Sequence, residues 1–355
     1  MALNWIDCHV HVLNGGIEEL QRLGSDQKTY GYAASNFLSV EGMDDAAQNA
    51  LGIAFKLLDP AHYAFGGLHY RFQYDFAEEV RRLREIGFDG IKMIENKPTE
   101  RKRLGYAQDD ARYDGMYRRA AELDMPMLIH VSDPRNFWDP ELAPSWAVAA
   151  GYAYTDGGFV SFDRLFLETV RMLEKHPDLR VCLAHLFFLS DDEKTLRSLM
   201  DRFPKLCLDI TAGTEMYYDF TRRPELWRRF FLDYRDRILY GTDNCNPAAS
   251  EDLRIRNDIN ALERRFLTES GLFPLWEDQI RGIGLPREAV EKITAENFRR
   301  FTSETPRPLD RGKALEYLQE RLAQKAFRLS EREAGLIKEV CGLLEKNIEK
   351  TGFNG

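Results

Sequence analysis

The chain has 355 residues, of which 44% are hydrophobic and 30% charged, so it can bury a full-sized core without disulfide cross-links. A formal net charge of -9 and the lack of long lysine or arginine runs argue against nucleic acid as a partner. Five scattered cysteines without a CxxC pair argue against a disulfide framework and a zinc knuckle. No apolar leader and no apolar window of about 18 residues is present, so we expect a cytoplasmic protein that makes no membrane contact.

Short apolar runs alternate with longer, charged amphipathic segments over most of the chain. Eight such runs occupy residues 5–12, 34–40, 63–70, 90–94, 126–131, 180–186, 206–211 and 237–243. Helix-like segments between them include residues 75–87, 112–124, 162–176 and 191–203. Eight strands in about 240 residues predict an α/β fold of the (β/α)8 TIM barrel type, which spans about 250 residues. An open doubly wound sheet is the alternative, but no GxGxxG motif follows a strand.

The character of the sequence changes after residue 301. The proline-containing polar segment TSETPRPLDRG (302–312) separates a barrel domain, residues 1–305, from a helical extension, residues 306–355. Two helices are expected at about 310–327 and 331–350, the second opened by a capping box of Ser330 and Glu333. This second helix carries an apolar stripe: Leu336, Ile337, Val340, Leu343, Leu344 and Ile348. We expect the stripe to pack on the barrel, and a homodimer contact is the alternative.

The first apolar run contains the stretch DCHVHV, residues 7–12. Because side chains alternate along a strand, Asp7, His9 and His11 are expected on one face and Cys8 on the other. Both imidazoles can then reach a single ion near the carboxyl end of the strand, where barrel enzymes build their active sites. Local hydrogen bonds to both histidines are the alternative interpretation.

Three other runs end in residues that can bind a metal. His130 ends the fifth run, His185 the sixth, and Asp243 the eighth. Strand ends of a parallel barrel open on one face, so these side chains are expected to converge with those of the first run. Imidazoles and a carboxylate are the ligands that borderline divalent ions prefer, with one position open for water or substrate. Cys182 lies an odd number of residues from His185, so we expect it to face outward under a helix.

The ordered motifs DCHVHV, GIKMI, PMLIHVSDP, LAHL, RILYGTDN and ENFRRF resemble the amidohydrolase superfamily, in its amidohydrolase-related (amidohydrolase 2) branch, over roughly residues 4–302. That branch also contains decarboxylases and lactonases. The resemblance implies a distorted TIM barrel in which one divalent ion, usually zinc, is held by His9, His11, His130 and Asp243. It implies that His185 contacts the substrate or assists proton transfer. Lys92 falls where relatives with two metals place a bridging residue, so a second metal is an open alternative.

Such a site predicts a hydrolase. The ion would act as a Lewis acid and lower the pKa of a bound water. Asp243 would take the proton of that water and pass it to the leaving group, while His185 would polarise the scissile carbonyl. We therefore expect cleavage of a C–O or C–N bond in an ester, lactone or amide. The alternatives are a decarboxylase of an aromatic or unsaturated carboxylic acid, and a metal-binding protein without turnover.

Residues on the loops are expected to select the substrate, a small molecule. The loop after His130 is rich in aromatic residues, which suits a lid, a pocket wall or simple packing over the barrel mouth. We expect Lys92, Arg135 and Trp138 to contact the substrate. Cations after the fourth and seventh runs would suit a carboxylate-bearing substrate, a solvated surface being the alternative; they are Lys97, Arg101, Lys102, Arg103, Arg222 and Arg223.

Overall fold

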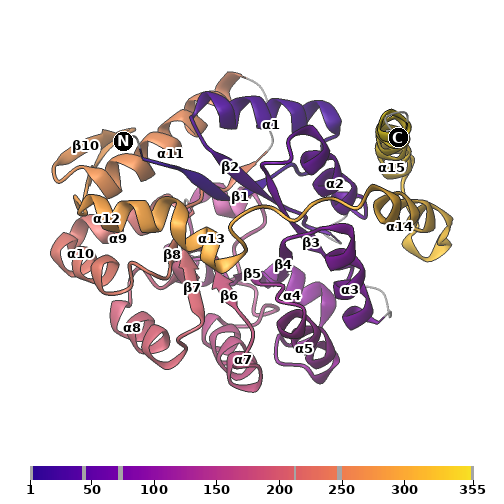
Figure 1. The fold of residues 1–355 in the computed structure, drawn as a ribbon. Helices are drawn as coiled ribbons and strands as arrows, with labels where there is room; N and C mark the ends of the chain where they lie inside the picture. Colours follow the sequence, from indigo (N-terminus) through magenta and orange to yellow (C-terminus); the bar gives the residue numbers. More distant parts are fainter. Residues whose placement is uncertain (1–2, 42–44, 71–74, 212, 246–249, 353–355) are drawn as a thin grey trace.

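The computed structural model describes residues 3–41, 45–70, 75–211, 213–245 and 250–352. In this part of the chain, nine parallel strands form one curled sheet that helices surround (Figure 1). The strands are β1 (Ile6–His11), β2 (Ala34–Leu38), β3 (Tyr63–Gly67), β4 (Gly90–Asn96), β5 (Met127–Val131), β6 (Val181–Leu183), β7 (Leu206–Asp209), β8 (Ile238–Leu239) and β9 (Asn244–Cys245). Each predicted run overlaps one of β1 to β8, although β4 continues two residues beyond its run, and the predicted TIM barrel is confirmed.

The barrel is distorted where its eighth strand is interrupted. The first piece, β8, pairs with β7, and the second piece, β9, pairs with β1. Between them, the backbone carbonyl of Tyr240 accepts a hydrogen bond from the backbone N–H of Cys8 (3.0 Å). The segment 238–245 thus joins the two ends of the sheet. Asp243 lies in the interruption, in the left-handed backbone region with φ of 54°.

Helices follow the strands around the outside of the barrel. They are α1 (Ile17–Thr29), α2 (Gln48–Leu58), α3 (Phe76–Ile86), α4 (Pro98–Leu104), α5 (Asp114–Glu122), α6 (Ser145–Ala149), α7 (Phe162–Lys175), α8 (Glu193–Arg202), α9 (Thr214–Arg222), α10 (Pro224–Asp233), α11 (Ser250–Thr268), α12 (Arg287–Glu291), α13 (Asn297–Phe301), α14 (Arg311–Ala323) and α15 (Glu331–Gly352). The hairpin of β10 (Leu272–Leu275) and β11 (Asp278–Arg281) follows α11. None of the described helices carries an apolar stretch long enough to cross a membrane.

The four helices predicted between strands correspond to α3, α5, α7 and α8. Local signals set the ends of α3, for example. The carboxylate of Asp75 accepts hydrogen bonds from the backbone N–H groups of Ala77 and Glu78, which caps the amino terminus. Gly87 ends the helix with φ of 110°, a conformation that favours glycine.

A bulge in β1 overturns part of the predicted face assignment. The register between β1 and β2 shifts between Asp7 and Val10, and an extra residue at such a point reverses the alternation of side chains. Asp7 faces outward and accepts a hydrogen bond from Gln27 of α1 (3.0 Å). Cys8 lies inside the barrel in an apolar cluster with Ile6. The expectation that Asp7 shares a face with the two histidines was therefore wrong.

Cys182 also lies inside the barrel, which corrects the prediction that it faces outward. It belongs to the same interior cluster as Leu128 of β5, its partner in the ladder. The outward positions of β6 are its neighbours Val181 and Leu183, which pack in the larger cluster between the sheet and the helices. The structure therefore agrees that Cys182 is a buried core residue and differs only in the side of the sheet.

The carboxyl-terminal helices pack on the barrel. α15 contacts α2 and α14, and α14 contacts α3 (Figure 1). The predicted capping box is confirmed, since the backbone N–H of Ser330 donates to Glu333 (2.7 Å) and that of Glu333 to Ser330 (3.2 Å). Of the predicted stripe, Ile348 lies outside the described side chains, Leu343 is partly buried, and four residues are buried: Leu336, Ile337, Val340 and Leu344. This burial within one chain favours packing on the barrel over a dimer contact.

A buried arginine joins α14 to the barrel and gives a testable prediction. Arg321 is 5% exposed, and its guanidinium lies 3.2 Å from Glu79 and 3.7 Å from Glu41. Arg321→Ala leaves two buried carboxylates without their cation, so we expect the free energy of unfolding to fall by about 3 to 5 kcal/mol. Denaturant titration measures it. The control Arg82→Ala removes an exposed pair with Glu320 across the same helices and should cost less than about 1 kcal/mol; equal losses would contradict the argument.

Candidate metal centre

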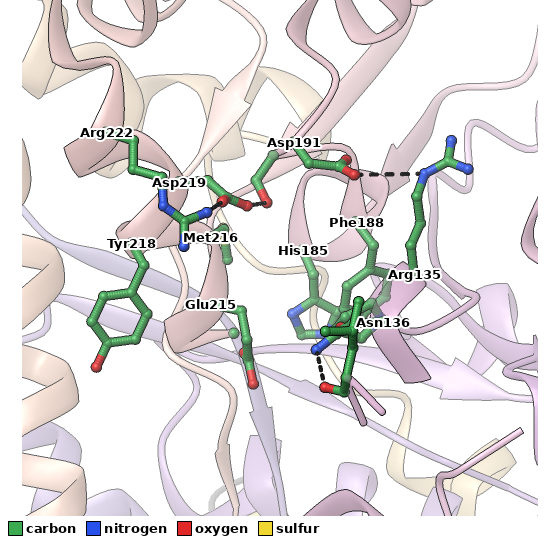
Figure 2. A pocket seen from close by; sticks show the side chains of 14 residues that line it. Arg135, Asn136, His185, Phe188, Asp191, Glu215, Met216, Tyr218, Asp219 and Arg222 are labelled. Carbon is green, nitrogen blue, oxygen red and sulfur yellow. Dashed lines mark hydrogen bonds and ion pairs between the residues drawn. The ribbon is translucent and has the colours of Figure 1, made fainter. Parts of the chain in front are cut away.

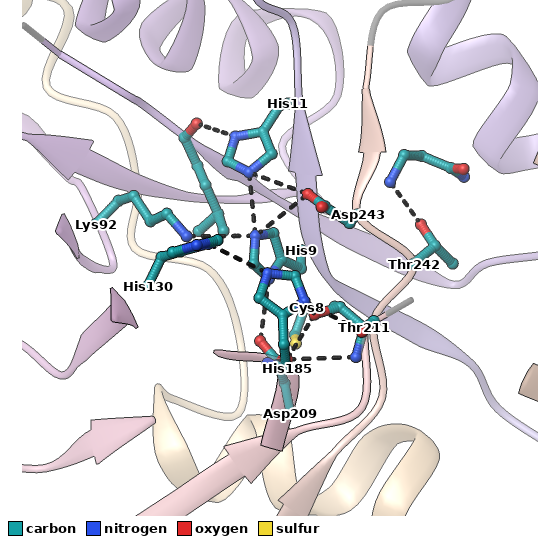
Figure 3. A network of polar contacts seen from close by, with 12 residues as sticks. Cys8, His9, His11, Lys92, His130, His185, Asp209, Thr211, Thr242 and Asp243 are labelled. Carbon is teal, nitrogen blue, oxygen red and sulfur yellow. Dashed lines mark hydrogen bonds and ion pairs between the residues drawn. The ribbon is translucent and has the colours of Figure 1, made fainter. Parts of the chain in front are cut away.

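Three side chains meet at the carboxyl ends of β1 and β8. The Nε2 atoms of His9 and His11 lie 3.0 Å apart. The Oδ1 atom of Asp243 lies 3.5 Å from the first nitrogen and 3.4 Å from the second (Figure 3). Among the described residues, this is the one group of three or more His, Cys, Asp or Glu side chains with mutually close ligand atoms. Both histidines are buried, whereas the Asp243 side chain is 36% exposed.

The hydrogen bonds of the two Nδ1 atoms determine the tautomers of His9 and His11. His9 Nδ1 is 3.0 Å from a carboxylate oxygen of Asp209, and His11 Nδ1 is 2.9 Å from the backbone carbonyl of Leu38. Both oxygens only accept hydrogen bonds, so each Nδ1 carries the proton and each Nε2 presents a lone pair. Burial holds the pKa of both imidazoles well below the ordinary value, which disfavours a second proton on either ring. Two lone pairs and a carboxylate therefore face one point, and this donor set fits a divalent cation.

Lys92, on β4, is the described cation nearest to this group. Its Nζ lies 3.3 Å from His9 Nε2 (Figure 3). Burial lowers the pKa of Lys92 to about 8, and the negative charges of Asp243 and Asp209 oppose that shift. The buried ammonium points into the barrel beside the cluster.

Asp209, at the end of β7, orients residues from two other strands. Besides His9, it accepts hydrogen bonds from the backbone N–H of His185 (2.7 Å) and the hydroxyl of Thr211 (2.6 Å). Analysis of the sequence missed this residue. The available signal was a carboxylate two residues before the end of the seventh apolar run.

Asp7 connects β1 to the interrupted eighth strand. Its carboxylate accepts from the backbone N–H of His9 (3.2 Å) and from both the backbone N–H (3.0 Å) and the hydroxyl (2.6 Å) of Thr242. Burial raises the pKa of Asp7 to about 6, and these hydrogen bonds oppose the rise. Because Asp7 points outward at the bulge, its buried carboxylate can accept hydrogen bonds from Thr242, the residue before Asp243.

The contact between Asp209 and His9 gives the second prediction. In Asp209→Asn the side chain keeps its shape but loses the charge that orients the His9 ring and raises its basicity. We expect the affinity for Zn²⁺ to fall about 10- to 100-fold while the fold is retained. Competition with a chelator of known affinity measures the loss. Unchanged affinity in a folded variant would show that Asp209 does not support the centre.

His130, at the end of β5, lies outside the group of three. Its Nε2 faces the backbone carbonyl of Ser132 (3.0 Å), and its Nδ1 lies 3.2 Å from Nε2 of His185. His185 Nδ1 in turn faces the carbonyl and hydroxyl oxygens of Thr211 at 3.2 and 3.0 Å. The two backbone carbonyls only accept hydrogen bonds, so His130 Nε2 and His185 Nδ1 carry the protons. His130 Nδ1 and His185 Nε2 therefore each carry a lone pair, and these two lone pairs face each other. The four histidines of the predicted site thus form two adjacent pairs of imidazoles.

A buried ion pair lies next to His130. Lys97 Nζ is 2.7 Å from both carboxylate oxygens of Asp133, and the hydroxyl of Tyr154 donates to the same carboxylate. Although burial alone would raise it, Lys97 and His130 bring the pKa of Asp133 down to about 2. The charge of Lys97 is therefore already paired within the chain.

A cavity of about 430 Å³ opens beside His185 (Figure 2). Its lining comes from the loop after β5, the segment after β6 and helix α9: Pro134, Arg135, Asn136, Leu142, His185, Phe188, Ser190, Asp191, Gly213, Glu215, Met216, Tyr218, Asp219 and Arg222. Of the residues predicted to contact substrate, Arg135 is part of this lining. Lys92 and Trp138 are not, and the Trp138 indole donates to the carbonyl of Val160 (3.1 Å) within a small aromatic core. Packing thus accounts for Trp138 in the aromatic loop.

The cations predicted to attract a carboxylate are occupied by partners within the chain. Five of them form ion pairs: Lys97 with Asp133, Arg101 with Glu168, Lys102 with Asp156, Arg103 with Glu100, and Arg222 with Asp219. Arg223 donates to the backbone carbonyl of Asp191 (3.1 Å). These pairs remove the basis on which a carboxylate-bearing substrate was expected.

A parallel barrel with histidines and a carboxylate converging at its strand ends has the architecture of an enzyme with a divalent metal site. The chain belongs to the amidohydrolase family, because the family model described as amidohydrolase matches residues 6–307. Comparison with curated proteins found no match.

Solved structures share the fold at low sequence identity. 2,6-Dihydroxybenzoate decarboxylase from Rhizobium is 15% identical with a TM-score of 0.53, over 84% of this chain and 98% of that one. 4-Oxalomesaconate hydratase from Rhodopseudomonas palustris is 15% identical with a TM-score of 0.54, over 84% and 95%. A putative amidohydrolase from Staphylococcus aureus is 14% identical with a TM-score of 0.55, over 84% and 99%. At such identities the comparison shows the fold alone.

Proposed function

We propose that the protein is a metal-dependent hydrolase that cleaves a C–O or C–N bond in a small ester, lactone or amide. The observation that carries the proposal is the placement of Asp243. Its carboxylate contacts the Nε2 atoms of both His9 and His11, yet the side chain is 36% exposed. A divalent ion, zinc by the preference of such ligands, would be held by these three residues and would supply Lewis-acid polarisation of an oxygen.

The residues of the chain would handle the proton. One oxygen of Asp243 faces the histidines, so the exposed part of its carboxylate would be available to a water. Asp243 takes the proton of the attacking water and returns it to the leaving group. Asp209 and the carbonyl of Leu38 keep the two imidazoles oriented throughout.

His185 lies between the group of three and the cavity, since its ring centroid is 5.5 Å from that of His9. It lines the cavity wall, and Thr211 holds its ring through Nδ1. A substrate in the cavity would therefore contact the ring of His185. The role of His130 as the fourth ligand of the ion stays a prediction from the sequence.

Product analysis in ¹⁸O-labelled water tests the reaction. The zinc-loaded protein is incubated with 4-nitrophenyl acetate, γ-butyrolactone and N-acetylglycinamide, and separately with 2,6-dihydroxybenzoate. We expect ¹⁸O in the acid product of at least one of the first three, and no release of carbon dioxide. Release of carbon dioxide without such labelling would establish the decarboxylase alternative, and turnover of neither set would favour metal binding without catalysis.

A further inference from the structure

The charges on the cavity wall do not suit an anionic ligand. Arg135 lies 3.0 Å from Asp163 and 3.8 Å from Asp191, and Arg222 lies 2.6 Å from Asp219 (Figure 2). Both described cations of the lining are thus neutralised by carboxylates. The lining as a whole contains three carboxylates and two guanidinium groups, with His185 neutral because burial lowers its pKa to about 3.

Glu215 is the carboxylate of this wall that has no cation. It lies in the first turn of α9 and is partly buried. No described lysine, arginine or histidine lies within ion-pair distance of it, and Figure 2 draws its side chain without a marked interaction, in contrast to Asp191 and Asp219. Burial raises the pKa of Glu215, and the nearby charges of Asp133 and Asp219 add to that rise. The backbone N–H of Glu215 itself donates a hydrogen bond to the carboxylate, which lowers the pKa, but no described cation balances its charge. A partly desolvated charge without a counter-charge is unfavourable until a cation reaches it.

We propose that Glu215 is a specificity-determining residue that binds a protonated amine of the substrate, while the scissile carbonyl lies beside His185 at the strand ends. This inference rests on the proposed function and names its substrate class: an ester, lactone or amide that carries an ammonium group, in place of the carboxylate expected from the sequence. An ammonium group would offset the desolvation of Glu215, whereas a substrate carboxylate would meet like charge.

Three hydroxamates of matched length test the inference without requiring turnover. 4-Aminobutanehydroxamate, pentanehydroxamate and glutaric monohydroxamate present an ammonium, a methyl and a carboxylate group at the same end of the chain. Their affinities for the zinc-loaded protein are measured by calorimetry. We expect the amine to bind about five- to tenfold more tightly than the methyl compound, and the carboxylate to bind most weakly.

Variants assign the preference to Glu215. Glu215→Gln should erase the advantage of the amine and leave the affinity for pentanehydroxamate unchanged, and Glu215→Asp should retain part of the advantage. Glu225→Gln, an exposed position on α10, is the matched control and should behave as the wild type. The inference is overturned if the amine binds no more tightly than the methyl compound, or if its advantage survives in Glu215→Gln. If none of the three hydroxamates binds, the metal centre of the proposed function fails and the inference fails with it.

Discussion

Asp243→Asn is expected to lower kcat/KM for the ester, lactone or amide that the enzyme cleaves by about 100- to 10,000-fold. Asparagine keeps the size of the side chain and its carbonyl oxygen can still face His9 and His11. It cannot accept a proton from the attacking water, which is the step assigned to the exposed part of the Asp243 carboxylate. Steady-state kinetics on the zinc-loaded variant measure the loss, with zinc content determined on the same sample.

The control for this variant is Asp178→Asn, an exposed carboxylate that pairs with Lys205 before the amino end of β6, away from the carboxyl strand ends that hold the site. It should retain wild-type kcat/KM. If Asp243→Asn bound zinc fully and kept its activity within about tenfold of the wild type, proton transfer by Asp243 would be wrong, because the loss of a general base costs more than that.

The second large effect concerns the ion itself. The double variant His9→Ala/His11→Ala removes both nitrogen ligands of the group of three, so we expect it to lose measurable zinc binding. In the metal-stripped wild type, zinc at about 1,000 times its dissociation constant should add about 4 kcal/mol to the free energy of unfolding, because it binds only the folded state. Thermal unfolding with and without zinc measures this difference, and the double variant should show no shift in Tm.

His176→Gln is the matched control, because this histidine lies at the end of α7 and bonds to Asp114 away from the site. Its zinc-dependent shift in Tm should equal that of the wild type. A double variant that still gained stability from zinc would place the ion elsewhere, for instance at the pair of His130 and His185.

The strands and the residues at their ends could be predicted from the sequence because a parallel barrel collects all carboxyl strand ends on one face. That rule located His9, His11 and Asp243 without knowledge of the loops. Asp209 was missed because the predicted run continued to residue 211, whereas β7 ends at Asp209. The bulge in β1 could not be predicted, since it follows from the register with β2 and leaves no signal in an alternating run. For that reason the position of Cys8 inside the barrel was not predicted.

The charges around the site could be predicted only in part, because the partners of several cations are remote in the chain. Lys97 bonds to Asp133 and Arg101 to Glu168, 36 and 67 residues away. Read alone, these cations suggest attraction for an anion, whereas the folded chain neutralises them. The orientation of the His130 ring also depends on contacts that form only in the folded chain. Its Nε2 faces the backbone carbonyl of Ser132, and its Nδ1 faces His185.

The central claim is that one divalent ion is held by His9, His11 and Asp243. A crystal of the protein soaked in zinc, with anomalous diffraction recorded at the zinc absorption edge, tests it most directly. We predict a peak about 2.0 to 2.1 Å from the Nε2 atoms of His9 and His11 and about 2.0 to 2.2 Å from a carboxylate oxygen of Asp243. A zinc-loaded crystal without a peak at these atoms would contradict the account.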